Sequence, residues 1–259
     1  PLACTQGRNV SDTYEIAELT KFAHELADAS GAVIRPYFRV PLDVDNKMPG
    51  DFDPVTAADR EAEAAIRAMI CETYPDHGII GEEHEDVAGG RYTWVLDPID
   101  GTRSFIAGFP TWGTLIALGL DGCPIIGVLD QPFTGERFVG VPGGAFIDGK
   151  SLQVRPCSSL SGAILFATTP DMFQPGEEIC AFQRVEARVK LRRWGGDCYA
   201  YGMLAHGLVD LIIEASMKPY DIQALIPIVE GAGGVVTTWD GSPAWNGGRL
   251  IAAGDKRVY

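Results

Sequence analysis

The hydrophobic pattern of the N-terminal quarter predicts two amphipathic helices. Between Thr13 and Tyr37 the apolar positions recur close to every 3.6 residues, and Pro36 marks the end of the predicted helix. A loop rich in Asp, Pro and Gly follows. A second helical stretch, "TAADREAEAAIRAMICETYP", then starts at the cap candidate Thr56 and stops at Pro75.

From residue 78 the pattern changes to short apolar runs that predict β-strands. The runs are bounded by turn residues, and Asp121-Gly122 and Asp148-Gly149 are typical of tight hairpin turns. The predicted strands of this part are "GII", "WVLD", "TLIALGL", "PIIGVLD", "RFVGVPGGAFIDG" and "LQV".

After residue 155 the pattern predicts strands that alternate with helices. The strands are "AILFATTP", "VKL", "VDLIIE" and "GGVVTTW", and the helices run from about 175 to 187, from Cys198 to His206, and onward from Asp221. Such alternation is typical of a layered α/β unit with short connections. The change of pattern occurs without a flexible linker, so we predict two subdomains, 1–155 and 156–259, that share one interface.

The composition narrows the class of protein. With 259 residues, 46 % hydrophobic and 22 % charged, the chain is of ordinary globular composition. No apolar run approaches the ~20 residues that span a bilayer, and the start lacks the layout of a signal peptide. We expect a soluble intracellular protein without a membrane partner, in the cytoplasm of a bacterium or the plastid stroma of a plant. The start at Pro1 suggests a processed or truncated chain.

Charge and cysteine usage exclude further classes. Asp and Glu outnumber Lys and Arg by 35 to 21, and the resulting charge of −14 repels a polyanionic backbone. We therefore expect no nucleic-acid partner, whereas a small phosphate substrate is compatible with a site that has its own cations. The cysteines are scattered singly, which predicts free thiols in a reducing compartment. They are Cys4, Cys71, Cys123, Cys157, Cys180 and Cys198.

The stretch "WVLDPIDGTRSF" places two carboxylates at the end of an apolar strand. Pro98 holds Asp97 in extended backbone and removes one N–H, so we predict that the strand ends there, and Asp100 follows. Gly101 permits unusual backbone angles, and Thr102 is a candidate N-cap for the next helix. Mg²⁺ prefers oxygen ligands and a helix N-terminus offers N–H groups to phosphate, so metal-assisted phosphate chemistry is one interpretation. An ordinary turn is the alternative.

Acidic residues also lie at the end of another predicted strand and at the start of a predicted helix. Glu82 and Glu83 follow an apolar strand in "IIGEEHED", and Asp221 begins an apolar helix in "KPYDIQALIPIVEGAGG". An Asp at a helix start is most often a cap. Three separate element ends that each present an acid favour a shared metal site over three unrelated turns.

The segments "WVLDPIDGTRSF", "GEE" and "YDIQALIPIVEGAGG" resemble the inositol monophosphatase superfamily of Mg²⁺-dependent, Li⁺-sensitive phosphomonoesterases. The resemblance covers most of the chain. It implies an α/β (α+β) fold, a layered αβαβα sandwich of the inositol monophosphatase and fructose bisphosphatase type. It also implies a homodimer, two or three Mg²⁺ ions, and a small phosphate monoester as substrate.

The resemblance further implies roles for individual residues. Asp59 of "VTAAD" and Thr102 match the pair that polarises the attacking water, and the N–H groups of Gly101 and Thr102 match a phosphate site. The predicted catalytic residues are Asp59, Thr102 and Glu82. We expect direct hydrolysis without a phosphoenzyme. The implied metal ligands are Glu82, Asp97, Asp100, Asp221 and the backbone carbonyl of Ile99.

Departures from the inositol phosphatase pattern concern the substrate. Arg103-Ser104 follows "DGT", and Tyr220 precedes Asp221, in an arrangement similar to the histidinol-phosphate phosphatase branch. Histidinol phosphate carries an ammonium and an imidazole, which acids bind well, whereas inositol phosphate presents hydroxyls. The predicted substrate residues are Arg103, Asp197 and Glu214.

Several alternatives remain open at this stage. Asp197 is also a candidate N-cap, and Arg103 is placed to steer phosphate or to pair with acids. Within the same chemistry, an inositol or other sugar-phosphate phosphatase is the second hypothesis. A catalytically silent metal or phosphate-binding protein is the third, although every expected ligand is present.

Other residues support weaker expectations. We interpret His84 as an exposed loop residue, Lys47 as part of a solvated loop, and Trp94 and Trp112 as packing residues. A Ca²⁺ loop is rejected because Lys47 and Pro54 occupy ligand positions of an EF-hand. The acids that raise this possibility are Asp43, Asp45, Asp51 and Asp53.

Overall fold

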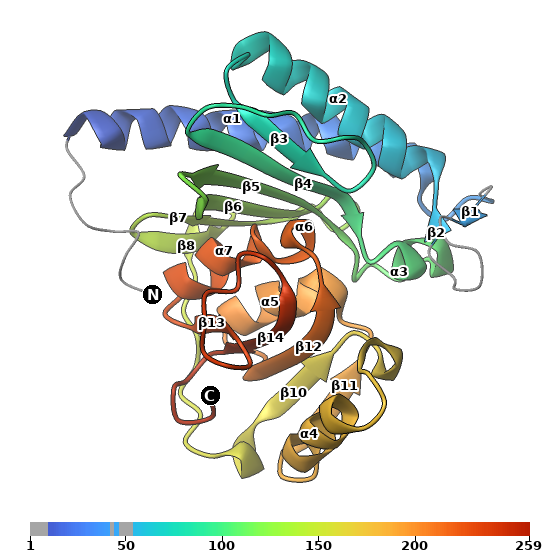
Figure 1. Cartoon of the computed structure of the whole chain (residues 1–259), viewed down its shortest axis with the longest axis vertical. Coiled ribbons are helices and arrows are strands. Elements are labelled where there is room, and N and C mark those ends of the chain that lie inside the picture. Colours follow the sequence, from blue (N-terminus) through green and yellow to red (C-terminus); the bar gives the residue numbers. More distant parts are fainter. Residues whose placement is uncertain (1–9, 42–43, 47–53) are drawn as a thin grey trace.

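The chain folds into five layers, in which two β-sheets alternate with three layers of helices (Figure 1). The computed structural model describes residues 10–41, 44–46 and 54–259. The layered αβαβα prediction is confirmed. From one outer face to the other, the helices are α1 (Val10–Ile34) and α2 (Ala57–Thr73), then α5 (Asp197–Ala205), α6 (Pro219–Ile222) and α7 (Leu225–Gly231), and last α4 (Glu177–Glu186).

The first sheet has seven strands in chain order, with β3 parallel to β4 and every later neighbour antiparallel. Its hairpin turns at Asp121-Gly122 and Asp148-Gly149 are confirmed, since both residues of each turn have positive φ, as in a type I′ turn. The strands are β3 (Gly78–Gly81), β4 (Tyr92–Asp100), β5 (Gly113–Leu120), β6 (Cys123–Gln131), β7 (Glu136–Val141), β8 (Gly144–Ile147) and β9 (Lys150–Ser151).

Both faces of the central strands of this sheet are buried. Trp94 and Leu96 pack with Phe22 of α1 in the core under α1 and α2, whereas Val95 packs with Leu225 in the core between the two sheets. This explains why the strands read as unbroken apolar runs rather than as alternating ones. The packing role predicted for Trp94 and Trp112 holds, because both are fully buried.

The second sheet has five strands in the order β11-β10-β12-β14-β13, with β10 parallel to both of its neighbours. The pattern did not predict β14, which lies antiparallel between β12 and β13. The strands are β10 (Ile164–Ala167), β11 (Leu191–Trp194), β12 (Leu211–Met217), β13 (Val235–Thr238) and β14 (Gly248–Ala253). Six short elements complete the described chain: β1 (Asp45–Asn46), β2 (Pro54–Val55), α3 (Thr102–Ala107) and the 3-10 turns η1 (Arg35–Tyr37), η2 (Leu160–Gly162) and η3 (Pro170–Met172).

One strand prediction is wrong. The segment "LQV" is not a strand, because the chain leaves the first sheet within it. The Leu152 N–H still donates to the Ala145 carbonyl of β8, but the Val154 N–H donates to the Ala232 carbonyl at the end of α7. The segment therefore connects the two sheets. The subdomain boundary predicted near residue 155 falls here and stays a prediction.

The helix boundaries show how the acids are placed. Thr56 caps α2 as predicted, and its N–H donates in return to the Asp59 carboxylate. The helix expected from Asp221 is two short helices, and the first begins earlier because Pro219 supplies its opening turn. Asp221 is thus the third residue of α6, and its carboxylate accepts the Lys218 N–H at 2.6 Å.

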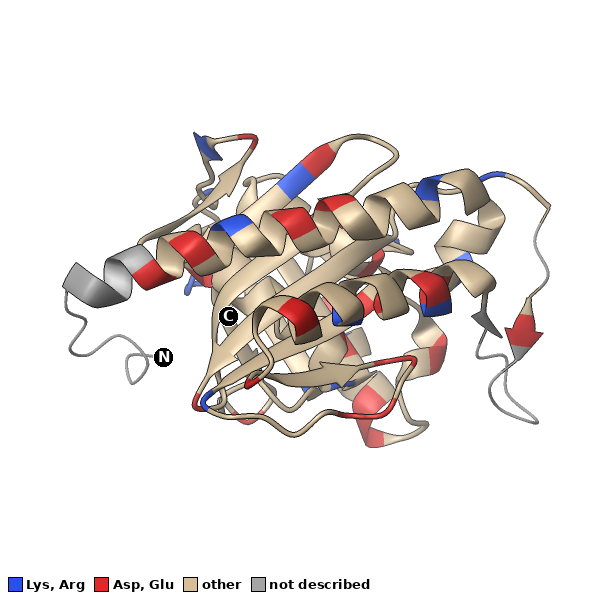
Figure 2. Cartoon of the chain, turned by 90° about the horizontal axis from the view of Figure 1, so that it is seen from above, with Lys and Arg blue, Asp and Glu red and all other residues tan. Residues whose placement is uncertain are grey.

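Surface charge and thiols complete the description. Figure 2, seen onto α1 and α2, shows acidic residues along both helices with fewer basic ones. None of the helices in the described ranges is long and apolar enough to cross a bilayer. The prediction of free thiols is wrong for Cys123, which forms a disulfide. Four other cysteines are free, namely Cys71, Cys157, Cys180 and Cys198, and Cys4 lies outside the described residues.

Candidate active site

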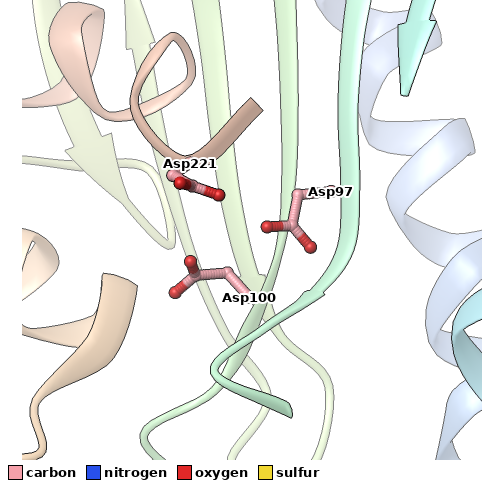
Figure 3. A group of neighbouring side chains, drawn as sticks. All are labelled: Asp97, Asp100 and Asp221. Carbon is pink, nitrogen blue, oxygen red and sulfur yellow. The ribbon is translucent and has the colours of Figure 1, made fainter. Parts of the chain in front are cut away.

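Three carboxylates converge where β4 leaves the first sheet (Figure 3). Asp97 and Asp100 come from the end of β4, and Asp221 comes from α6, more than a hundred residues further along the chain. One oxygen of each lies within 4.8 Å of the others. The structure therefore brings together three of the predicted metal ligands.

The path of β4 explains how two acids of one strand reach the same point. Pairing with β5 is regular to Asp97, shifts register, and resumes between Asp100 and Gly113. The strand thus continues past its predicted end at Asp97. Pro98 removes a ladder donor, and its carbonyl instead accepts the Thr114 hydroxyl at 2.8 Å, which holds the irregular turn to the sheet.

The cluster carries negative charge that its surroundings do not balance. Burial raises the pKa of Asp97 well above its usual range, and the charges of Glu82, Asp100 and Asp221 raise it further. Burial also raises the pKa of Asp221 to about 7, although the backbone hydrogen bond from Lys218 acts in the opposite direction. Buried acids that repel one another in this way form a site for a cation.

Each acid of the cluster accepts one backbone N–H. The Ile99 N–H donates to Asp97 at 3.1 Å, and the Cys198 N–H donates to Asp100 at 2.7 Å. These amides aim the carboxylates and leave other lone pairs for a ligand. An all-oxygen donor set of this kind fits a hard cation such as Mg²⁺.

The other two predicted ligands lie next to this cluster. Glu82 follows β3, and its charge is the strongest of the neighbouring charges that raise the pKa of Asp97. It also raises the pKa of Asp59, which burial raises most. The Ile99 carbonyl accepts the Thr102 hydroxyl at 3.1 Å.

The turn into α3 differs from its prediction. Gly101 is the N-cap, with φ 85°, and Thr102 is the first helical residue. Only glycine fits here, because a Cβ on Gly101 would lie 2.9 Å from the Asp197 side chain. The Asp59 carboxylate accepts the Thr56 N–H and hydroxyl, and its role with Thr102 in polarising a water stays a prediction.

A cavity of about 330 Å³ opens beside the cluster. The N-terminal turn of α3 borders it on one side, and α5 and β12 border it on the other. All three predicted substrate residues line it. The residues that line it include Asp100, Gly101, Thr102, Arg103, Asp197, Glu214 and Asp221, together with Thr168, Met172, Tyr201, Ser216 and Met217.

Asp197 is fixed by hydroxyl groups and does not cap a helix. It is the first residue of α5, has φ 43°, and one carboxylate oxygen accepts the hydroxyls of Ser104 at 2.6 Å and Thr111 at 2.9 Å. Burial raises the pKa of Asp197, while these hydroxyls and the charge of Arg103 lower it. The simple N-cap alternative is therefore excluded.

Glu214 is held by partners that the sequence did not indicate. It is 2 % exposed, and it accepts the Thr168 N–H at 3.1 Å, the Thr168 hydroxyl at 2.5 Å and the Tyr201 hydroxyl at 2.7 Å. Burial raises the pKa of Glu214 and these hydrogen bonds lower it. Thr168 lies 46 residues away in sequence, so no local motif signals the contact.

The weaker expectations divide into those inside and outside the described residues. His84 is exposed in its loop, as predicted, and its Nδ1 lies 3.4 Å from a carboxylate oxygen of the buried Glu63. Asp45 forms an ion pair with Arg60 at 2.6 Å. Lys47, Asp43, Asp51 and Asp53 lie outside the described residues.

The five-layered fold and the acid-lined cavity, taken with a family match over almost the whole chain, define the class of protein, a phosphatase. More narrowly, the chain belongs to the inositol monophosphatase family, whose model matches residues 15–259. The match includes both sheets, all three acids of the cluster and the cavity.

Relatives with curated names and solved structures agree on the family and differ in substrate. The chain is 45 % identical to the bifunctional phosphatase IMPL2, chloroplastic, of Arabidopsis thaliana, covering 96 % of this chain and 75 % of that protein. It is 39 % identical to the histidinol-phosphatase of Chlorobaculum parvum, over 83 % of each. An inositol monophosphatase from Zymomonas mobilis superimposes with a TM-score of 0.85 at 43 % identity, covering 97 % of this chain and 96 % of that one.

Proposed function

We propose that the protein hydrolyses L-histidinol phosphate to L-histidinol and phosphate with Mg²⁺. The observation that carries the proposal is the distribution of acids along the cavity. Asp100 and Asp221 belong to the metal cluster, and Asp197 and Glu214 line the same cavity as two further acids outside that cluster. A substrate with a phosphate at one end and an ammonium and imidazole at the other matches this arrangement.

The residues that would hold Mg²⁺ are those of the cluster. Asp97, Asp100 and Asp221 would bind it with Glu82 and the Ile99 carbonyl, and the raised pKa values of the three aspartates fit a site that needs a cation. When bound, Mg²⁺ supplies positive charge that neutralises phosphoryl oxygens and makes water a better nucleophile. We propose two or three ions, with Li⁺ as an inhibitor.

The protein's own groups would act on the phosphate and the water. Gly101 and Thr102 border the cavity, and their N–H groups would hold phosphate oxygens. A water would attack phosphorus in line with the ester bond, which breaks as the P–O bond to water forms, without a phosphoenzyme. Asp59, Glu82 and Thr102 would orient that water and take its proton, and burial raises the pKa of Asp59 toward the value of a useful base.

The rest of the cavity would select the leaving group. Asp197 and Glu214 would accept hydrogen bonds from the ammonium and imidazole, while Arg103, exposed at the rim, would approach the phosphate. The names of relatives support a histidinol-phosphatase assignment at 33–39 % identity in three bacteria. We also propose a homodimer, which rests on the family resemblance alone.

A second candidate function is hydrolysis of inositol 1-phosphate or another sugar phosphate. It is supported by the name of a relative, inositol monophosphatase 2 of Solanum lycopersicum, which is 33 % identical over 91 % of this chain. The metal cluster would serve this substrate equally well. Only the groups around the leaving group separate the two candidates.

Phosphate release tests the proposal directly. L-histidinol phosphate and inositol 1-phosphate are compared with Mg²⁺ and with EDTA. We expect a higher kcat/KM for histidinol phosphate, and loss of turnover of both substrates in EDTA. A preference for inositol 1-phosphate would select the second candidate. Absence of Mg²⁺-stimulated turnover of any monoester would indicate a silent binding protein.

A further inference from the structure

We infer that a β-bulge at Ser216 builds a wall of two thioethers, Met172 and Met217, that selects leaving groups with a planar ring. The inference deepens the proposed function and rests on it for the identity of the ring. The wall borders the same cavity as Glu214 and is formed by the end of β12 and by η3.

The bulge changes which face of β12 presents Met217. Glu214 pairs with Leu250 and Met217 with Gly248, so three steps along β12 oppose two along β14, and one residue is extra. In a regular strand, residues 214 and 217 would point to opposite faces. The extra residue is Ser216, whose φ of 61° is the left-handed conformation that side chains rarely adopt.

The packing of β12 confirms this change of face. Ile212 packs in the core between the sheets, whereas Ile213 and Ala215 pack in the core that α4 covers. Strict alternation would place Met217 with Ile213 and Ala215, in the core that α4 covers. Met217 instead packs against the core between the sheets and lines the cavity with Glu214.

Ser216 also fixes the second methionine. Its hydroxyl donates to the Met172 carbonyl at 3.1 Å and so joins the end of η3 to the bulge. Met172 is partly buried against the core under α4 and lines the cavity. Backbone strain kept at a site border is a sign of function, and here the strained residue links two methionines that line one cavity.

The chemistry of this wall differs from that of a polyol site. Thioethers are polarisable and pack well on aromatic rings, but they offer a sugar hydroxyl almost no hydrogen bonding. Glu214 and Asp197 border the same space as acceptors. The combination suits a ring that is flat, weakly polar on its faces and able to donate from its edge, as an imidazole is.

The test separates the ring from the other groups of the substrate. 3-Phenylpropyl phosphate carries a ring without an ammonium, ethanolamine phosphate carries an ammonium without a ring, and glycerol 2-phosphate carries neither. Met217→Gln keeps the length of the side chain and adds polarity, and Met217→Leu is the matched apolar control. The same pair is made at Met172.

We expect the Gln variants to lower kcat/KM for 3-phenylpropyl phosphate and histidinol phosphate by about 10-fold, mainly through KM. The two substrates without a ring should change by less than about twofold, and the Leu variants should resemble the parent. Equal losses on all four substrates, or loss in the Leu variants equal to that in the Gln variants, would overturn the inference.

Ser216 acts through the methionines, so it is tested as a positioning residue. Ser216→Gly keeps the bulge, because glycine adopts positive φ freely, but it removes the hydroxyl. We expect about a threefold higher KM for ring substrates with kcat unchanged, and recovery in Ser216→Asn, which tolerates positive φ and retains a donor. An unchanged KM in Ser216→Gly would show that the hydroxyl does not position Met172.

The inference and the proposed function fail in different ways. If the parent enzyme prefers inositol 1-phosphate to histidinol phosphate, the proposed function is wrong. If the parent enzyme does not prefer 3-phenylpropyl phosphate to glycerol 2-phosphate, or if that preference survives both Gln variants, the thioether wall is wrong, whatever the natural substrate is.

Discussion

The site contains two groups of acids that are alike in residue type and differ in their surroundings. In the first group, Asp97, Asp100 and Asp221 lie within 4.8 Å of one another, and each accepts a backbone N–H. Elsewhere on the cavity, Glu214 accepts three hydrogen bonds and Asp197 accepts two hydroxyls.

The difference in partners indicates a difference in role. The first group is short of donors, so its negative charge needs a bound cation, whereas the second group is oriented by donors and can receive a donor from a substrate. Burial raises the pKa of every acid in both groups; hydrogen bonds from hydroxyls lower it in the second group, whereas the charges of neighbouring acids raise it further in the first. Burial alone therefore does not distinguish a metal ligand from a substrate-binding acid. The number and type of hydrogen-bond donors to the carboxylate distinguish the two.

The largest expected effect follows from removing a charge in the first group. Asp97→Asn keeps the shape of the side chain and its contact with Ile99 but removes an anionic ligand. Because a catalytic metal contributes several kcal/mol to the stabilisation of transition-state charge, we expect turnover of every monoester to fall by about 10³-fold or more. Phosphate release at saturating Mg²⁺ measures the loss, and near-normal turnover would remove Asp97 from the metal site.

Removing an acid of the second group should affect one substrate more than another. Asp197→Ala and Glu214→Ala should raise KM for histidinol phosphate by about 10- to 100-fold, because each removes a charge-assisted hydrogen bond to the leaving group. KM for glycerol 2-phosphate should change far less. Glu214→Gln, which retains the volume, controls for local disruption around Thr168 and Tyr201. Equal losses on both substrates would assign these acids to the fold.

Local sequence signals predicted much of the first group and little of the second. Asp97 and Asp100 stand around Pro98 at the end of an apolar run, so spacing and backbone chemistry are enough to suggest a site. The orientation of Glu214 depends on Thr168, 46 residues earlier, and on Tyr201. Contacts of this kind are set by the packing of β10, β12 and α5, which no local pattern contains.

The same limit explains the errors in the fold. Apolar runs and Asp-Gly turns predicted the first sheet and its hairpins, because each depends on neighbouring residues. The strand β14 and the bulge at Ser216 were not predicted, since pairing between distant strands decides both. Thr102 was expected to cap α3, but the close approach of Asp197 requires Gly101 at that position.

A smaller effect concerns stability without metal. Burial raises the pKa of Asp221 from 3.8 to about 7, so the folded apo-protein holds a proton that the unfolded chain releases near pH 4. Stability from this group is thus present at low pH and is lost as the pH rises through 7. In EDTA we expect Tm to fall on the order of 5 °C between pH 5 and 8.

Two controls connect this pH dependence to the first group of acids. In Asp221→Asn the decline of Tm in EDTA should be shallower, because the titrating group is absent. Added Mg²⁺ should raise the Tm of the parent protein more at pH 8 than at pH 5, since only deprotonated acids bind the ion. A Tm in EDTA that rises from pH 5 to 8 would contradict the raised pKa of Asp221.

The smallest expected effect tests whether donors orient the second group. Tyr201→Phe removes one hydroxyl and leaves Glu214 with its two donors from Thr168. A hydrogen bond to a charged group contributes about 1.5 kcal/mol or more, and because the two Thr168 donors keep Glu214 in place, only part of this loss should reach the substrate; we expect KM for histidinol phosphate to rise about fivefold with kcat unchanged. The change should be absent in a Glu214→Gln background, because the hydroxyl then has no anion to orient. If Tyr201→Phe lowered kcat on glycerol 2-phosphate equally, Tyr201 would support the whole cavity rather than Glu214.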